Sequence, residues 1–324
     1  MSTDQKMETR CLPASPAALA EAGRILRGQG LVAFPTETVY GLGADATSGA
    51  AVAKIYLAKE RPQFNPLIAH CLDQASAERF GLFDENAKKL ATAFWPGPLT
   101  LVVPARENCA VSDLARAGLS SVALRVPAHP VAQALLREAG VPIAAPSANR
   151  SGRVSPTHAG HVMGDLDQRI DMVIDGGPCD VGVESTIVSC LDGQVTLLRP
   201  GGLARDEIER VLRRKLDARE GDAINAPGLL ASHYAPKAQM RLDAIEVSKE
   251  EAILDFGGRF ADVQQASFDL SPKGDLKEAA ANLFAFLRAL DATGAEVIAV
   301  APIPHEGLGE AIRDRLQRAA APRG

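Results

Sequence analysis

The sequence has few aromatic side chains, no surplus of positive charge and no long apolar run. Aromatic residues make up 4% of its 324 residues, and 35 basic side chains stand against 40 acidic ones. The net charge of −5 excludes the broad basic surface that displaces counterions from a nucleic-acid duplex. No apolar stretch reaches the roughly 18 residues that a membrane-spanning helix needs. We therefore expect neither stable nucleic-acid binding nor a membrane partner.

Cysteine is also scarce. The five cysteines contain no C-x-x-C pair, and an odd number does not favour a disulfide framework. Their spacing excludes a zinc finger. The first eleven residues mix acidic and basic side chains and form no secretory signal. These features are typical of a reducing compartment, and we expect a cytoplasmic protein.

The short motifs of several enzyme classes are missing or misplaced. Residues 41–46 match G-x-G-x-x-A, but the preceding strand should end near Phe34 and the next helix begin near Ser48, which is too far apart for a dinucleotide-binding turn. A P-loop and a G-x-S-x-G nucleophile elbow are absent. His158 and His161 have no further Cys or His nearby, which favours a surface helix over a zinc site. We assign no metal to protein side chains.

Apolar runs alternate with amphipathic segments along residues 1–216. Ser15-Pro16 predicts the start of a helix that ends at Gly28, followed by a buried strand at 31–34 and a helix at 48–59. A last helix is predicted at 201–216. Further strand candidates lie at 66–71, 99–103, 122–126, 143–145, 172–174, 186–189 and 195–198. The alternation predicts an α/β domain whose strand order stays open.

The composition changes at residues 217–239, which predict a linker. Residues 240–324 then carry strand candidates at 252–256 and 297–301 and helix candidates from Asp275 to Gly294 and at 308–319. This pattern predicts a second, smaller α/β unit.

Four cations stand next to turns. Lys59 and Arg61 precede Pro62, Arg125 ends an apolar run, and Arg199 precedes Pro200. Ligand clefts of α/β sheets form at strand ends, so these cations indicate an anion site. A solvated helix terminus remains the alternative for Lys59 and Arg61.

The polar loop at 146–152 offers donors to phosphate or carboxylate oxygens, or is a turn that bonds its own backbone. On the residues alone, His70 is interpreted as a core residue and His233 as an exposed linker residue.

Taken together, the segments resemble the Sua5/YrdC threonylcarbamoyl-AMP synthases, in their long Sua5 form. The resemblance spans nearly the whole chain. It rests on residues 35–43 (PTETVYGLG), 59–67 (K-x-R-P with N-P-L), 95–100 (WPGPLT), 125–127 (R-x-P), 146–152 (PSAN-x-SG), 184–187 (ESTI), 198–201 (LRPG), 226–228 (APG), 233–236 (HYAP) and 307–312 (GLG-x-AI).

The resemblance implies a YrdC-like twisted mixed-sheet domain with a central concave cleft at 1–216, a linker that acts as a lid at 217–239, and a smaller Rossmann-like α/β domain at 240–324. It implies a nucleotidyltransferase that makes threonylcarbamoyl-AMP and diphosphate from L-threonine, bicarbonate or CO2, and ATP. The product would pass to downstream proteins that complete the t6A modification at tRNA position 37. No catalytic serine or cysteine is needed, because threonine carbamate is the nucleophile.

The resemblance also assigns residues by position. The catalytic residues would be Lys59, Arg61 and Arg199, which hold the phosphates with Mg²⁺ bridging their oxygens. Further contacts to ATP would come from Ser121, Ser147, Asn149, Ser155, His233 and Tyr234. Threonine would be bound by Thr36, His70, Arg125 and Ser185, with Arg125 on its carboxylate.

Two other functions stay open. A YrdC-like domain can be an RNA-binding module without adenylate synthesis, which the negative charge disfavours. Carbamoyl transfer through carbamoyl-adenylate, as in related hydrogenase-maturation proteins, is the other alternative.

Overall fold

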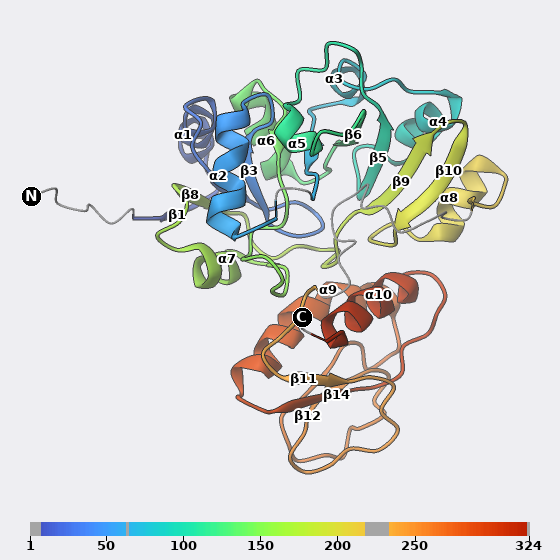
Figure 1. Ribbon diagram of the computed structural model, residues 1–324. Helices are drawn as coiled ribbons and strands as arrows, with labels where there is room; N and C mark the ends of the chain where they lie inside the picture. Colours follow the sequence, from blue (N-terminus) through green and yellow to red (C-terminus); the bar gives the residue numbers. More distant parts are fainter. Residues whose placement is uncertain (1–7, 63–64, 218–232, 323–324) are drawn as a thin grey trace, which may run out of the picture.

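The computed structural model describes residues 8–62, 65–217 and 233–322. Their strands form one ten-stranded sheet and one four-stranded sheet. Figure 1 shows the larger unit above the smaller one, with α9 (Leu276–Ala292) and α10 (Gly309–Ala320) lying between the small sheet and the larger unit. Mixed α/β architecture with two sheets agrees with the predicted fold class.

The large sheet is mixed. Pairs β1·β8, β2·β8, β4·β6 and β5·β9 are parallel, and the remaining pairs are antiparallel. In spatial order its strands are β1 (Arg10–Pro13), β8 (Met172–Asp175), β2 (Val32–Phe34), β3 (Gly41–Asp45), β7 (Ile143–Ala144), β4 (Ile68–His70), β6 (Ser121–Arg125), β5 (Leu99–Pro104), β9 (Thr186–Leu191) and β10 (Gln194–Arg199).

Helices α1 and α2 begin next to the residues where the sequence predicts their starts. The hydroxyl of Ser15 accepts a hydrogen bond from the Ala18 amide, and Ser48 does the same for Ala51. None of the described helices is long and apolar enough to cross a bilayer. The helices are α1 (Pro16–Arg27), α2 (Gly49–Lys59), α3 (Gln74–Ala77), α4 (Glu85–Phe94), α5 (Asp113–Arg116), α6 (Pro130–Ala139), α7 (Ala159–Leu166) and α8 (Arg205–Leu212).

Helix α8 is shorter than the predicted helix at 201–216. Gly201 packs against the backbone of Glu184, where a Cβ would lie 2.3 Å from the Glu184 carbonyl oxygen, so this stretch makes a close turn instead. At the other end Arg213, with φ of 55°, adopts the left-handed conformation and ends the helix. The predicted helix is therefore wrong at both ends.

Strand β3 was not expected from the sequence, because three of its positions are Gly or Ala. Its glycines serve packing: a Cβ on Gly43 would lie 2.8 Å from Ile143 Cγ2 and 2.9 Å from Phe34 Cε1. Residues 41–46 thus lie in and directly after a strand antiparallel to β2, which agrees with the rejection of a dinucleotide-binding turn.

The smaller sheet is parallel throughout, in the order β11 (Gln239–Arg241), β14 (Val297–Val300), β12 (Ala252–Asp255) and β13 (Ser267–Asp269). Strands β11 and β13 were not predicted, since they are three-residue edge strands with exposed side chains. The side chain of Asp275 accepts from the amides of Lys277 and Glu278 and caps α9, as predicted.

The two units share a buried apolar cluster. Val39, Val154 and Val183 of the larger unit pack in it with Leu283 and Phe284 of α9. The packing is tight at Gly182, where a Cβ would lie 2.3 Å from the carbonyl oxygen of Ala280. The smaller unit is therefore packed directly against the segment that leads into β9.

Candidate active site

A partly open pocket, whose outline encloses about 470 Å³ including open solvent, lies where the ends of β4, β6 and β10 meet the segment that precedes β9. We call this pocket the cavity. Eight of the residues predicted from the sequence line it: Arg61, His70, Arg125, Ser147, Ser185, Arg199, His233 and Tyr234. They come from segments far apart in the chain, so the fold brings together most of the predicted site.

Three guanidinium groups converge on this cavity. Arg61 follows α2, Arg125 ends β6 and Arg199 ends β10, and each is at most 8% exposed. Glu184 is the only carboxylate in the cavity lining among the described residues. Burial lowers the pKa of Arg61 to about 10, which leaves the group charged at neutral pH. The lining therefore carries a net positive charge suited to an anion.

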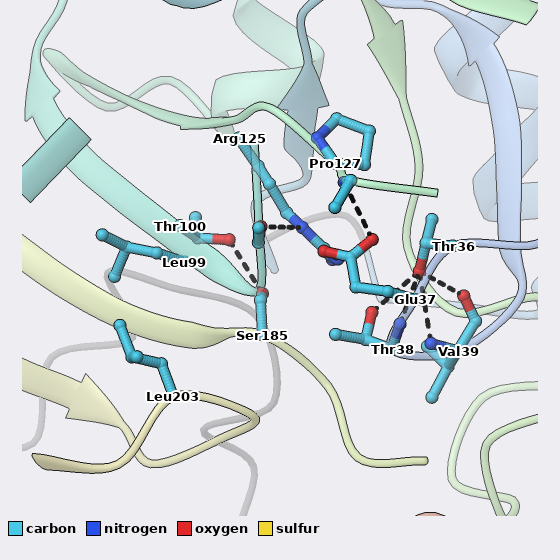
Figure 2. A network of polar contacts seen from close by, with 12 residues as sticks. Thr36, Glu37, Thr38, Val39, Leu99, Thr100, Arg125, Pro127, Ser185 and Leu203 are labelled. Atoms are coloured by element: carbon cyan, nitrogen blue, oxygen red, sulfur yellow. Dashed lines mark hydrogen bonds and ion pairs between the residues drawn. The ribbon is translucent and has the colours of Figure 1, made fainter. Parts of the chain in front are cut away.

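Arg199 is anchored on Ser185. Its Nε and Nη2 donate to the Ser185 carbonyl oxygen at 3.2 and 2.8 Å, and Nη2 also lies 3.3 Å from the Ser185 hydroxyl. That hydroxyl lies 2.8 Å from the hydroxyl of Thr100 on β5, a contact that can be followed in Figure 2. These bonds fix the direction in which the guanidinium faces the cavity.

Arg125 pairs with Glu37, a residue to which sequence reasoning gave no role. Figure 2 shows the Glu37 carboxylate facing the Arg125 guanidinium. Arg125 Nη2 lies 2.7 Å from Glu37 Oε1, and the backbone amide of Ala128 donates to Glu37 Oε2 at 3.1 Å. Burial raises the pKa of Glu37, but Arg125 outweighs burial and holds the pKa below its ordinary value. The only signal in the sequence was the position of Glu37 inside the 35–43 motif.

Thr36 lies behind the cavity wall. Its hydroxyl is 2.8 Å from that of Thr38, donates to the carbonyl oxygen of Val39 at 2.7 Å and accepts from the Val39 amide at 3.2 Å (Figure 2). Thr38 and Val39 line the cavity, whereas Thr36 does not. Thr36 thus holds the turn that presents Thr38, which the sequence analysis did not single out.

Lys59 holds the loop at 146–152 rather than lining the cavity. Its Nζ donates to the Ser147 carbonyl at 2.6 Å and to the Asn149 carbonyl. Burial, together with nearby Arg61, lowers the pKa of Lys59 well below its ordinary value. The Asn149 amide donates within the same loop, to the carbonyls of Arg150 and Arg153. Both residues therefore set the loop that carries Ser147.

His70 and His233 are both buried and neutral. Burial lowers the pKa of each to about 3. In both rings Nδ1 is buried and has no hydrogen-bond partner within the described ranges. The prediction of an exposed His233 from residues alone is wrong, because its ring lies 4.0 Å from that of Tyr234 and its amide donates to the Arg318 carbonyl.

Tyr234 has φ of 63°, a conformation that an aromatic residue rarely adopts. Its ring stacks on Phe284 of α9 at 5.5 Å and lies 5.3 Å from the Arg315 guanidinium of α10. The smaller unit therefore holds this residue in place. Most of the predicted linker, residues 218–232, lies outside the described residues.

Ser155 and Ser121, two predicted ATP contacts, occupy different places. The Ser155 hydroxyl donates to Glu184 Oε1 at 2.5 Å, directly beside the cavity. Ser121 is the half-buried first residue of β6, at the opposite end of that strand from Arg125, and does not line the cavity. The fold thus brings Ser155, but not Ser121, next to the other predicted residues.

Both carboxylates near the cavity already have partners on each oxygen. Glu37 uses its two oxygens on Arg125 and Ala128, and Glu184 uses its own on Ser155 and Arg315. Across residues 8–62, 65–217 and 233–322, no group of three or more His, Cys, Asp or Glu side chains is arranged to hold a metal ion.

Comparison with known proteins gives two family matches. The profile of the Sua5/YciO/YrdC family, described as "Telomere recombination", matches residues 24–201, and that of the "Threonylcarbamoyl-AMP synthase, C-terminal domain" matches residues 203–321. A threonylcarbamoyl-AMP synthase of Bacillus subtilis is 43% identical, over 94% of this chain and 93% of the relative.

Solved structures give the same result. The crystal structure of Pyrococcus abyssi Sua5 complexed with L-threonine is 38% identical, with a TM-score of 0.86 over 97% of both chains. A variant of that archaeal protein, in which a His and the following Tyr are replaced by Ala, is 37% identical, with a TM-score of 0.87 over 96% of both chains.

Proposed function

Because this chain belongs to the Sua5/YrdC family of threonylcarbamoyl-AMP synthases, we propose that it is an enzyme which joins L-threonine, bicarbonate or CO2, and ATP into threonylcarbamoyl-AMP, with release of diphosphate. The observation that carries the proposal is the convergence of Arg61, Arg125 and Arg199 on one cavity. A triphosphate and an amino-acid carboxylate both need such cationic donors.

On this proposal, threonine occupies the side of the cavity formed by Arg125, Ser185 and His70. The guanidinium of Arg125 suits the amino-acid carboxylate, and the Ser185 hydroxyl suits a polar group of the substrate. His70 adds no charge, since its low pKa keeps it neutral. Thr36 acts through the turn that presents Thr38. The crystal structure of P. abyssi Sua5 with L-threonine supports threonine as the substrate.

ATP occupies the side formed by Arg61, Arg199 and Ser147, with Asn149 and Ser155 supporting that wall. Arg61 and Arg199 bind phosphate oxygens as planar donors. Lys59 supports the loop from behind, and it becomes a direct phosphate ligand only when its Nζ leaves the carbonyls of Ser147 and Asn149. The role of Ser121 stays a prediction.

The reaction needs no covalent help from the protein. The neutral threonine amino group attacks CO2, a bond forms between nitrogen and carbon, and a proton leaves the nitrogen for solvent, which gives a carbamate. A carbamate oxygen then attacks the α-phosphorus of ATP. The bond between that phosphorus and the bridging oxygen to the β-phosphate breaks, and diphosphate leaves with the negative charge. Arg61 and Arg199 stabilise this charge, and the cavity holds the two reactants next to each other.

Magnesium enters as part of the substrate, MgATP, held by phosphate oxygens and water. Among the residues that the structure describes, no group of three or more His, Cys, Asp or Glu side chains is arranged to hold a metal ion. We therefore assign no protein ligand to the metal.

His233 and Tyr234 cover the cavity and exclude water from the adenylate, which water would hydrolyse. They form the only consecutive His-Tyr pair in this chain. A consecutive His-Tyr pair is also the site of the double alanine variant of P. abyssi Sua5 described above. The finished adenylate would then serve the t6A modification of tRNA through separate transfer proteins.

Threonine-dependent pyrophosphate release distinguishes this function from its alternatives. We expect ATP consumption that requires both L-threonine and bicarbonate. A carbamoyl-adenylate enzyme would instead use a carbamoyl donor without threonine, and an RNA-binding module would consume no ATP and bind RNA in a strongly salt-dependent manner.

A further inference from the structure

Arg315 belongs to α10 of the smaller unit, but its guanidinium is buried at the candidate active site of the larger unit. The residue has 0% exposure. Nε donates to Glu184 Oε2 at 2.8 Å, and Nη1 donates to Asp314 Oδ2 at 2.5 Å. Its Nη2 is buried without a hydrogen-bond partner among the described residues. Burying a guanidinium costs much free energy unless carboxylates hold it, so this contact fixes a definite geometry.

Glu184 and the residue after it contact groups in both predicted substrate subsites. Its second oxygen accepts from Ser155, on the nucleotide side, and its side chain lines the cavity. The next residue, Ser185, carries the carbonyl that anchors Arg199 and a hydroxyl on the threonine side. A shift of Glu184 therefore displaces groups on both sides of the cavity.

The smaller unit contacts the same short segment at a second point. Gly182 lies so close to α9 that a Cβ would clash with the carbonyl oxygen of Ala280. Residues 182–184 are thus held by α9 at one end and by α10 at the other. Arg315 also lies 5.3 Å from the ring of Tyr234, which lines the cavity.

We propose that Arg315 is a positioning residue for the adenylation reaction: it holds Glu184 against Ser155 and so fixes Ser185 and, through the Ser185 carbonyl, the guanidinium of Arg199. This inference rests on the proposed function. It gives the smaller unit a direct part in the active site, through one side chain.

Replacing Arg315 by Met keeps much of the volume and removes the bonds to Glu184. We expect R315M to lower kcat/KM between about 10-fold and 100-fold, since small displacements of reacting groups have effects of this size. R315K keeps the charge and should recover part of the loss. The matched control is E310Q, which removes a partly exposed ion pair between the same helix and Arg205 of the larger unit. E310Q should keep the parent kcat/KM.

The pH profile separates positioning from a general loss of structure. Groups that face Glu184 are Arg315 of α10, Arg199 of β10, and Ser155, His233 and Tyr234. Asp314 next to Arg315 keeps Arg318 as a partner when Arg315 is replaced. In the parent, Arg315 and Arg199 outweigh burial and hold the pKa of Glu184 at about 2. Loss of Arg315 raises the pKa of Glu184. As the pH is lowered, the activity of R315M should therefore begin to fall at a higher pH than the activity of the parent.

The double variant E184Q/R315M tests this cause. In R315M the buried charge of Glu184 has lost its partner Arg315, and the change of Glu184 to Gln removes that charge. The double variant should therefore not show the additional loss of activity at acid pH, and it should be more active than R315M. A parent-like pH profile in R315M, or equal losses in R315M and E310Q, would overturn the proposal.

Affinity for L-threonine, measured by calorimetry without ATP, supplies a readout independent of turnover. We expect R315M to bind L-threonine at least about tenfold more weakly than the parent and E310Q. Unchanged affinity would overturn the positioning role. A parent protein that binds threonine but releases no pyrophosphate would contradict the proposed function alone, and the affinities would still decide the role of Arg315. If R315M does not fold, R315K and E184Q/R315M decide by the same affinities.

Discussion

The guanidinium of Arg125, at the end of β6, lies 2.7 Å from the carboxylate of Glu37, which is 88 residues earlier in the chain. This pair places a fixed cation at the wall of the cavity, and the Ala128 amide holds the other oxygen of the carboxylate. Arg125 is thereby oriented before any substrate arrives. Preorganised donors of this kind lose little entropy on binding.

Exchange of Arg125 for Lys should weaken threonine binding selectively. Lysine keeps the charge but loses the planar fork that can serve a carboxylate and Glu37 at the same time. We expect R125K to raise KM for L-threonine about tenfold or more, with a much smaller change in KM for ATP. Steady-state kinetics with each substrate varied in turn measures both. R210K, at an exposed ion pair on α8, is the control and should match the parent.

Arg199 should affect the chemical step more than binding. Its two bonds to the Ser185 carbonyl aim the guanidinium at the cavity, and we assign it to the charge of departing diphosphate. We expect R199K to lower kcat about 100-fold or more, the size of effect found when one preorganised donor to a developing charge is removed. Single-turnover measurement of pyrophosphate release tests this. An unchanged kcat with a raised KM would assign Arg199 to binding only.

Acid should destabilise the fold through its buried histidines. The pKa of His70 and of His233 is about 3 in the folded protein, against roughly 6.5 in an unfolded chain. Between these values the unfolded state binds more protons, so the free energy of unfolding falls as the pH falls. Each histidine contributes about 1.4 kcal/mol per pH unit below roughly 6.5.

Urea unfolding at pH 7.0, 6.0 and 5.0 measures this dependence. H233Q removes one of the histidines whose pKa is lowered in the folded protein and should reduce the slope between the two lower pH values. A slope identical to that of the parent would show that His233 is protonated in the folded state.

Gly201 should tolerate no side chain, although its backbone does not require glycine on conformational grounds. An alanine Cβ would lie 2.3 Å from the Glu184 carbonyl oxygen and 2.5 Å from the Ser185 carbonyl carbon. We expect G201A to cost about 1–3 kcal/mol of stability and to lower activity, because the segment carrying Ser185 must move.

The matched control for this variant is G164A. Gly164 lies within α7 with no atom within 4 Å of an added Cβ, so alanine there should stabilise the protein by roughly 0.5–1 kcal/mol. Thermal unfolding of both variants measures the difference. Equal stability of G201A and the parent would contradict the close packing at Gly201.

Local signals in the sequence predicted much of the fold. The helix starts at Ser15, Ser48 and Asp275 followed from capping chemistry, which depends only on neighbouring residues. The edge strands β11 and β13 and the glycine-containing β3 were missed, since their pairing depends on distant partners. Short strands with weak apolar patterns carry little local information.

The sequence predicted eight of the residues that line the cavity, but not the contacts among them. The convergence of Arg61, Arg125 and Arg199 agrees with the anion site expected at strand ends. The pairing of Arg125 with Glu37 and of Glu184 with Arg315 could not be predicted, because ion pairs across more than 80 residues depend on the tertiary fold. His233 is buried for the same reason, since α9 and α10 cover its segment.

The most direct test supplies the protein with ATP, L-threonine and ¹³C-bicarbonate and determines the mass of the adenylate that forms. The account predicts a threonylcarbamoyl adenylate that carries the label, together with pyrophosphate, in amounts that fall sharply in R199K and R125K. Formation of AMP or ADP without a labelled adenylate, or ATP consumption that does not depend on threonine, would contradict it.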